Sequence, residues 1–430
     1  MSVPGPRLPL AVQTVLYGIW PQRYLHWCRR RFGDQFRLRL PTIGPSVVLA
    51  DPASIRDVFS LRADQITTNA TVLEPFLGPK SLLCVDGASH DRQRRLLARA
   101  FRAEAMKGYA ETMEEVALND VASWPIGREF ALHPRLQAIT LEIILRVAFG
   151  VNDAGRLDTL RSRLRRFLRD AGSLLVLNPG FRRELRGRSP WARFQGLRAG
   201  VLDALNDELV QRRSAADLHD CTDVLSLMLR SENDDDQLDN EELLDNLLTM
   251  VLAGHDTTAT ALAWTFDLLL HHPVALDRLK EELAEGGRSY LGAVIKESLR
   301  LRPVVVDTGR TWAQPARLGG TLYAAGTAVT ASMLLAHHRA DLYPRPLAFL
   351  PDRFLADAPE PLTWIPFGGG VRRCLGAGFA TLEMEVLLRT IITHCELRAA
   401  RSRPDAQKRR AVTLVPRRGA RVVLEASRVE

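Results

Sequence analysis

Apolar and polar positions follow a two-residue period near the start of the chain. The alternation runs through residues 36–40 and again through 46–50, with a proline and a glycine between the two runs. That period places successive side chains on opposite faces of a strand, so it predicts two neighbouring strands. Asp51 and Pro52 then have the order of a helix cap followed by proline in the first turn. We expect a small N-terminal sheet over about residues 33–50 and a helix directly after it.

Helical periods replace the strand pattern over much of the remaining chain. Amphipathic segments fill the stretch from about residue 105 to residue 283. The longest segment runs from Asp239 to His272 and begins with Asp239 and Glu242 at capping-box spacing. It is apolar on most of its faces, which is typical of a helix buried through the centre of a large protein.

Strand-like runs return at the end of the chain, over residues 412–415 and 421–424. The complete pattern predicts a mainly α protein with minor β structure (α+β), a helical body over about residues 51–303 and one long central helix. Length alone suggests two or three domains. Motifs from the first and last quarters of the chain nevertheless indicate one shared site, so we predict a single domain over residues 1–430.

Charge and cysteine content narrow the classes of protein. The 430 residues carry a formal net charge of +8, but the arginines of residues 156–213 are not gathered with aromatic stacking residues, so we expect no nucleic-acid partner. The five cysteines are odd in number and have no C-x-x-C or zinc-like spacing, which favours a reduced, intracellular setting. The apolar run from Leu8 to Trp20 is too short to span a bilayer. We expect a cytoplasmic protein with no membrane anchor.

Candidate chemistry is concentrated in the sequence F-G-G-G-V-R-R-C-L-G at residues 367–376. A thiolate that binds a metal needs donors to its sulfur, a backbone that comes close to the cofactor, and a nearby cation. The glycines of this run permit a close approach, and Arg372 is suited to bond a haem propionate. Cys374 is therefore a candidate haem ligand, although a lone cysteine is more often a small buried apolar residue.

This run resembles the haem-binding loop of the cytochrome P450 family, which we expect over residues 366–376. The matching positions are Phe367, Gly368, Gly370, Arg372, Cys374 and Gly376. The sequence A-G-H-D-T-T at residues 253–258 resembles the oxygen-activating segment of the same family. The resemblance implies that Ala253 approaches the haem, that Thr257 holds water or dioxygen, and that Asp256 supplies protons. Taken alone, Thr257 would more often bond back to its own helix.

Two later motifs match the family in order and spacing. They are K-E-S-L-R at residues 296–300 and P-D-R-F at residues 351–354. By resemblance, Glu297, Arg300 and Arg353 form a buried network that supports the cysteine loop and retains haem. We do not expect these three residues to be catalytic.

The resemblance also implies the groups that bind the haem propionates. His90 and Arg94 are one helical turn apart in an early segment, and Arg310 follows the K-E-S-L-R helix. Many family members have tryptophan where His90 stands. Together with Arg372, these residues would supply four basic groups for two carboxylates.

The implied protein is an enzyme, a haem-thiolate monooxygenase that carries haem b (iron protoporphyrin IX) and resembles the soluble, bacterial-type members of the family. It would insert one oxygen atom from O2 into a C–H bond of a lipophilic small molecule, because residues 304–306 and Leu252 line the pocket in relatives. Asp307 would orient a polar group of that substrate or cap local backbone.

Electrons would come from a separate ferredoxin or flavodoxin with its NAD(P)H reductase, because no nucleotide-binding loop or flavin module is present in the sequence. We expect a monomer. Two alternatives remain open: a haem-thiolate enzyme that uses peroxide, and a non-catalytic haem-binding sensor. The intact pair Asp256 and Thr257 argues against both.

Overall fold

The computed structural model describes most of the chain. The described residues are 3–40, 44–68, 73–101, 106, 108–150, 153–171, 182, 188–230, 237–318, 320–356 and 362–429. Parts of two predictions lie outside these ranges: residues 41–43 of the N-terminal sheet, and residues 172–181 and 183–187 of the arginine-rich amphipathic stretch.

Contacts between residues divide the chain into two compact units. The first, called the sheet unit below, comprises residues 1–69, 117–137 and 257–430, and the second, called the helical unit, comprises residues 70–116 and 138–256. Each unit is described by itself. The assignment of residues 1–430 to one domain stays a prediction.

The sheet unit contains the strands that the structure describes. Its elements are α1 (Leu10–Ile19), α2 (Pro21–Phe32), β1 (Gln35–Leu40), β2 (Gly44–Leu49), α3 (Pro52–Phe59), η1 (Ala63–Gln65), β3 (Ile66–Thr67), β4 (Glu129–Ala131), α14 (Pro273–Ala284), α15 (Ser289–Leu301), β5 (Asp307–Trp312), β6 (Ala316–Leu318), β7 (Thr321–Tyr323), β8 (Ala328–Ser332), α16 (Met333–His337), α17 (Arg353–Ala356), η7 (Gly370–Arg372), α18 (Ala377–His394), β9 (Cys395–Ala399), β10 (Gln407–Arg410), β11 (Thr413–Pro416) and β12 (Arg421–Ser427).

The structure describes six helices that lie wholly within the helical unit. They are α4 (Glu74–Leu77), α5 (Gly87–Ala98), η3 (Arg99–Phe101), α9 (Ala154–Ala171), α11 (Pro190–Arg213) and α12 (Val224–Leu229). Three further helices cross the boundary between the units along the chain: α7 (Tyr109–Val121), α8 (Leu132–Phe149) and α13 (Asn240–Leu270). These elements confirm the mainly α class with minor β structure.

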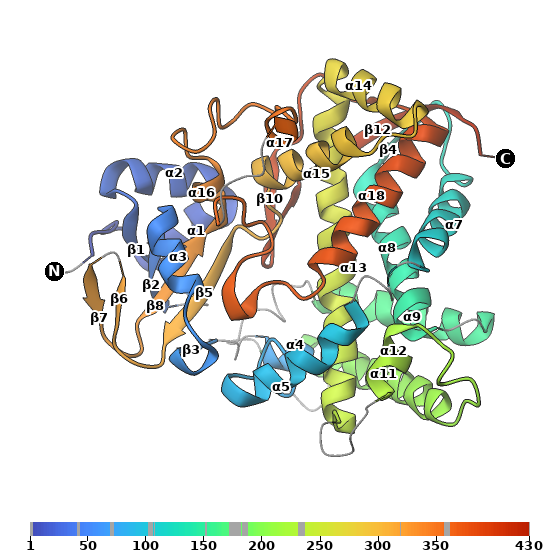
Figure 1. The fold of residues 1–430 in the computed structure, drawn as a ribbon, viewed down its shortest axis with the longest axis horizontal. Helices are drawn as coiled ribbons and strands as arrows, with labels where there is room; N and C mark the ends of the chain where they lie inside the picture. Colours follow the sequence, from blue (N-terminus) through green and yellow to red (C-terminus); the bar gives the residue numbers. More distant parts are fainter. Residues whose placement is uncertain are drawn as a thin grey trace. The chain divides into compact units, whose positions relative to one another are not determined.

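A five-stranded sheet forms in the order β1-β2-β8-β5-β3 and is mixed, since β2 and β8 are parallel while the other neighbours are antiparallel. Figure 1 shows these strands in blue and orange, because they come from opposite ends of the sequence. The alternation predicted in the N-terminal strands is present. Val48 packs in a cluster with α1 and α2, whereas its neighbours Val47 and Leu49 pack in a second cluster with α3.

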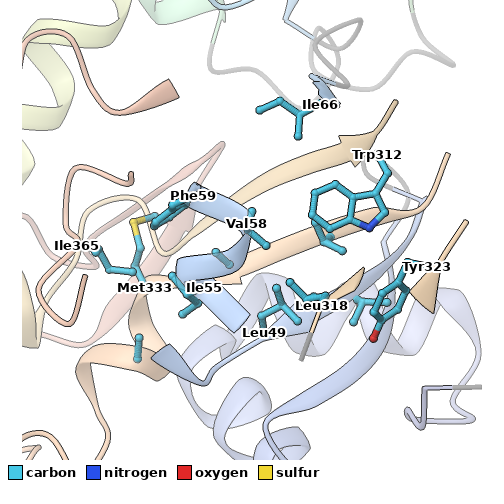
Figure 2. Packing of buried hydrophobic residues seen from close by; sticks show 14 residues of the cluster. Leu49, Ile55, Val58, Phe59, Ile66, Trp312, Leu318, Tyr323, Met333 and Ile365 are labelled. Carbon is cyan, nitrogen blue, oxygen red and sulfur yellow. The ribbon is translucent and has the colours of Figure 1, made fainter. Parts of the chain in front are cut away.

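The second cluster, drawn in Figure 2, joins the sheet to the segment before the cysteine loop. Ile55, Val58 and Phe59 of α3 pack in it with Trp312 of β5 and with Ile365. The helix begins as predicted, because the Asp51 carboxylate accepts a hydrogen bond from the Ser54 amide at 2.7 Å. The cluster therefore fixes the chain immediately ahead of the candidate haem-binding loop.

The capping box predicted for the longest helix is also confirmed. The Asp239 amide donates to the Glu242 carboxylate at 3.0 Å, and the Glu242 amide donates to the Asp239 carboxylate at 2.8 Å. Helix α13 follows from Asn240 to Leu270 (Figure 1, yellow), two residues short of the predicted end at His272. Pro273 begins the next helix, α14.

The two strands predicted near the C-terminus form, but they do not pair with each other. β11 pairs with β10, whereas β12 lies between β4 and β9 in a three-stranded antiparallel sheet. Gly419 stands between them with a φ of 80°, in the left-handed region that favours glycine.

Candidate active site

The loop around Cys374 is held by backbone hydrogen bonds and by close packing of its glycines. The Cys374 amide donates to the Phe367 carbonyl at 2.9 Å, and the Arg373 amide donates to the Gly370 carbonyl at 3.0 Å. Gly370 has a φ of 66°, and a Cβ there would lie 2.3 Å from the Phe59 carbonyl oxygen. Only glycine fits that position, so the loop can lie directly against α3.

Cys374 ends this loop just before α18, with an exposed thiol. Gly368 and Gly376 flank it, and a Cβ at either position would meet no protein atom within 4 Å. Gly368 has a φ of 66° and needs glycine for its backbone, whereas Gly376 has an ordinary φ of −83° and is the N-cap of α18. The protein thus leaves open space beside both glycines that flank Cys374.

The remaining cysteines offer less suitable ligands. Burial raises the pKa of Cys28 to about 12 and that of Cys395 to about 12, so both are neutral thiols near neutral pH. The pKa of Cys221 is also raised, first by burial and then by its hydrogen bond to Asp217. Cys84 is half-buried in the helical unit. Because the thiolate is the form that binds metals, Cys374 is the best candidate of the five.

A buried ionic network is connected by hydrogen bonds to the segment that precedes the loop. The Arg300 guanidinium donates to Glu297 at 2.7 and 2.9 Å, and Arg353 donates to the same carboxylate at 3.1 Å. The side chains of Glu297 and Arg300 are both 0% exposed. Arg300 also donates to the backbone carbonyls of His337 and Pro346, each at 2.8 Å. The structure therefore brings together the three residues that the sequence assigned to this network.

His337 carries the support onward to the loop. Its Nε2 accepts a hydrogen bond from the Ile365 amide at 2.8 Å, and the Ile365 carbonyl accepts one from the Gly368 amide at 3.0 Å. Burial, helped by the Arg300 cation, lowers the pKa of His337 to about 3, so the imidazole stays neutral and keeps its acceptor. The ionic network and the cysteine loop are thus connected through one neutral histidine.

The central-helix motif lies on α13. Asp256 and Thr257 are half-buried, and Ala253 is exposed. His255 is buried and its Nδ1 bonds the Val251 carbonyl of its own helix at 2.8 Å, while its backbone carbonyl accepts from the Thr140 hydroxyl at 2.9 Å.

Gly254 of α13 packs closely against α8. A Cβ at this position would lie 2.5 Å from Cδ1 of Ile144 on α8, within the helical unit. Because Cδ1 is the far end of the Ile144 side chain, a small shift of that side chain would relieve this contact.

The predicted propionate groups are divided between the units. Arg310 is buried on β5 and donates to the Thr308 hydroxyl at 2.9 Å, and Arg372 is half-buried in η7; both belong to the sheet unit. His90 and Arg94 lie one turn apart on α5 of the helical unit, where the His90 Nδ1 donates to Asp91 at 3.1 Å. Each pair is in place within its own unit, and the convergence of all four stays a prediction.

Two residues of the segment near the expected pocket contact the N-terminal helices. Val306 packs in the cluster between α1, α2 and the sheet. Asp307 is half-buried, and its carboxylate accepts a hydrogen bond from the Tyr17 hydroxyl of α1. This bond ties Asp307 to the N-terminal helix, and a role in orienting a substrate group stays a prediction.

Sequence reasoning missed Glu383 on α18. Its side chain is completely buried, and neither carboxyl oxygen has a hydrogen-bond partner among the described residues, although the Thr258 side chain on α13 partly stabilises the charge. Burial raises its pKa to about 8, so the carboxyl is protonated at neutral pH. The available signal was a glutamate within the apolar run of α18, directly after the cysteine loop.

Comparison with known proteins identifies the class. The family model described as cytochrome P450 matches residues 3–423. A Mycobacterium tuberculosis protein named cytochrome P450 135B1 is 39% identical over 99% of this chain and 92% of its own length. Another from the same organism, cytochrome P450 138, is 36% identical over 98% of this chain and 96% of its own.

Solved structures support the fold. Retinoic acid-bound cyanobacterial CYP120A1 matches with a TM-score of 0.84 and 24% identity, covering 98% of this chain and 99% of that chain. The heme domain of a cytochrome P450DA mutant matches with a TM-score of 0.85 and 21% identity, covering 100% of this chain and 98% of that chain.

The chain therefore belongs to the cytochrome P450 family. It is a monooxygenase whose cofactor is haem b, bound through a cysteine thiolate. Within the described residues, no helix is long and apolar enough to cross a membrane. The exposed Cys374 thiol, the open space beside both flanking glycines, and the basic groups Arg310 and Arg372 in the same unit form a donor set that fits this cofactor.

Removal of the Glu297 carboxylate should destabilise the protein strongly. Glu297→Ala leaves two arginines, one of them fully buried, without their carboxylate, and stranded charges of this kind cost about 3–5 kcal/mol. Urea unfolding of the haem-loaded protein measures the loss, and haem content after gel filtration should fall with it. Lys280→Met is the matched control, because it breaks an exposed pair with Glu396 and should cost less than about 1 kcal/mol. Equal losses in the two variants would contradict the supporting role of the network.

Glu383 should make stability depend on pH. Its pKa is near 4.5 when unfolded and about 8 when folded, so the native state holds the extra proton between these values, and its contribution to stability falls as pH rises through that window. Glu383→Gln does not titrate. The unfolding free energy of this variant should therefore rise relative to wild type by up to about 1.4 kcal/mol per pH unit across the window.

The measurement is urea unfolding of both proteins at several pH values from about 5 to 8. Glu281→Gln, at an exposed position on α14, is the control and should keep a constant offset from wild type. A constant offset for Glu383→Gln as well would show that Glu383 is ionised in the folded protein.

Proposed function

We propose that this monooxygenase inserts one oxygen atom from O2 into a C–H bond of a lipophilic small molecule. The observation that carries the proposal is the loop that places the exposed Cys374 between two glycines with open space beside them, while the sequence places an acid and an alcohol side by side on α13. When bound, the haem supplies the redox chemistry, and a thiolate ligand favours O–O cleavage. Cys374 is its ligand in this proposal, with Phe367, Gly368 and Gly376 shaping the loop.

In this proposal, four basic groups would bind the haem propionates. Arg310 and Arg372 belong to the sheet unit, and His90 and Arg94 to the helical unit. Two carboxylates and four basic groups favour charge-assisted hydrogen bonds, which are stronger than neutral ones. Ala253 would approach the bound cofactor, as the family resemblance implies.

Proton delivery is assigned to Asp256 and Thr257. The Asp256 carboxyl gives up a proton and recovers it from water, and the Thr257 hydroxyl holds the water that receives it. Both side chains are half-buried, which allows contact with water on one side and with a pocket on the other. Glu383 holds a second proton on the Thr258 side of the same helix.

Electrons come from a separate protein, a ferredoxin or flavodoxin reduced by its NAD(P)H reductase. The exposed Arg373 beside Cys374, and the net charge of +8, favour an acidic partner of this kind. We also propose that the chain acts as a monomer in the cytoplasm.

Thiolate ligation by Cys374 has a direct spectroscopic test. The dithionite-reduced wild type with carbon monoxide should give a strongly red-shifted Soret band, and Cys374→His should lose it because imidazole replaces the thiolate. Cys395→Ala is the control and should keep the band, since the buried Cys395 is a neutral thiol. Loss of the band in Cys395→Ala, with the band kept in Cys374→His, would assign the ligand to Cys395. A histidine-type band in the wild type would overturn the proposal.

The acid and alcohol pair is tested by coupling. With a substrate selected by its spin-state shift, Asp256→Asn should lower turnover about 100-fold or more, the usual contribution of a positioned acid. Thr257→Ala should keep consuming NAD(P)H but release hydrogen peroxide in place of product. Thr265→Ala on the same helix, whose hydroxyl donates to the Ala261 carbonyl one turn earlier, should stay coupled.

Two results would favour the alternative functions. Turnover with hydrogen peroxide as fast as turnover with the partner proteins would indicate a peroxide-using enzyme. Spin-state shifts without any product or NAD(P)H consumption would indicate a sensor.

A further inference from the structure

Helix α1 presents its apolar side chains to solvent and its polar side chains to the protein. Only Gln13 and Tyr17 are buried, at 1% and 6% exposure, whereas Val12, Val15 and Ile19 are 41%, 51% and 54% exposed. The three apolar residues are spaced i, i+3 and i+7, so they share one face of the helix. A surface helix normally has the opposite orientation.

This orientation is fixed by hydrogen bonds of the two buried polar side chains. The Gln13 amide donates to the Leu8 carbonyl at 2.8 Å and accepts from the Arg39 amide at 3.1 Å. The Tyr17 hydroxyl donates to the buried Asp307 carboxylate. Rotating α1 to bury its apolar face would leave these polar groups unsatisfied, which costs more than the exposed valines do. The hydrogen bonds of Gln13 and Tyr17 therefore keep the apolar face of α1 exposed to solvent.

Helix α2 adds arginine and tryptophan beside this face. Arg23, Trp27 and Arg30 are exposed and spaced i, i+4 and i+7, and Arg31 is exposed next to them. The exposed Trp20 joins the two helices. None of these three arginines has an acidic partner among the residues that the structure describes.

The charge of this region has one sign. Residues 1–33 contain five arginines and no acidic residue. The first acid, Asp34, is already paired with Arg29 at 2.6 Å and with Arg339 at 2.8 Å. A groove of about 1060 Å³ next to α2 is lined by the N-terminal segment, by Trp27, and by arginines that include Arg37. The groove offers a basic recess where an anionic group would be neutralised.

We propose that the α1–α2 face, defined by Val12, Val15, Ile19, Trp20, Arg23, Trp27, Arg30 and Arg31, binds the surface of an anionic lipid bilayer. The apolar side chains enter the acyl boundary, the two tryptophans sit at headgroup level, and the arginines and the groove bind lipid phosphates. The association is peripheral, with the two helices lying on the bilayer surface.

Other occupants match the face less well. In a symmetric dimer the same face meets itself, which would bring two unpaired arginine clusters together. An acidic protein would satisfy the arginines but would have to present an apolar surface of its own to α1. An anionic bilayer supplies both an apolar interior and a layer of negative charge.

The test is co-sedimentation of the haem-loaded, full-length protein with vesicles. We expect binding to equal parts phosphatidylcholine and phosphatidylglycerol at low salt, and little binding to phosphatidylcholine alone. Each arginine near an anionic surface contributes roughly five-fold to affinity, so the triple variant Arg23→Gln, Arg30→Gln, Arg31→Gln should bind about 100-fold more weakly. The double variant Val15→Ser, Ile19→Ser should lose at least about ten-fold.

Two matched controls separate this face from general effects. Arg165→Gln, Arg166→Gln, Arg169→Gln removes the same charge from exposed positions on α9, and Val274→Ser, Leu322→Ser removes exposed apolar groups elsewhere. Both controls should bind as wild type does. The carbon monoxide spectrum and far-UV circular dichroism check that every variant is folded.

The wild type alone also gives a readout if a variant fails to fold. Brominated lipid should quench its tryptophan emission, because Trp20 and Trp27 would lie at the headgroup level. Absence of vesicle binding and quenching, or equal losses in the α9 control, would overturn the proposal. A dimer that Val15→Ser, Ile19→Ser abolishes, without vesicle binding, would assign the face to a second copy.

Discussion

The buried carboxylate of Glu297 is the constraint on which the candidate site depends. An isolated charge in a protein interior is too costly to persist, so its two arginines have to remain in place. Arg300 in turn binds the carbonyl of His337, and the neutral ring of His337 accepts the amide of Ile365, directly before the cysteine loop. One buried charge therefore orders a segment more than sixty residues further along the chain, and this explains how residues without a chemical role can be essential to a catalytic loop.

Burial acts differently on each titratable group, and the differences sort the residues by function. It keeps His337 neutral as an acceptor, keeps Glu383 protonated near neutral pH, and keeps Cys28 and Cys395 as inert thiols. Cys374 is the exposed cysteine of the chain, and it is placed where the glycines leave space for a cofactor. The proposed haem ligand is thus distinguished by exposure as well as by its motif.

Local patterns predicted the elements whose causes are local. The capping box of α13 and the cap of α3 depend on side chains three residues apart, and both formed as expected. Partners brought together by the fold were not readable in the same way. β11 and β12 are neighbours in sequence but pair with other strands, and Gly254 lies against Ile144, more than a hundred residues away. Glu383 was missed because burial of a glutamate is a property of the packed structure.

The orientation of α1 also depends on residues that are distant in the sequence. Its sequence is mostly apolar, yet its two buried polar side chains decide which face packs against the protein. Gln13 and Tyr17 find buried partners that only the assembled sheet provides, and an unsatisfied buried polar group costs more than an exposed valine. The rule that buries Glu297 with its arginines is therefore also the rule that turns Val15 and Ile19 outward. Satisfaction of polar groups, more than the count of apolar ones, sets which surfaces of this chain remain open to a partner.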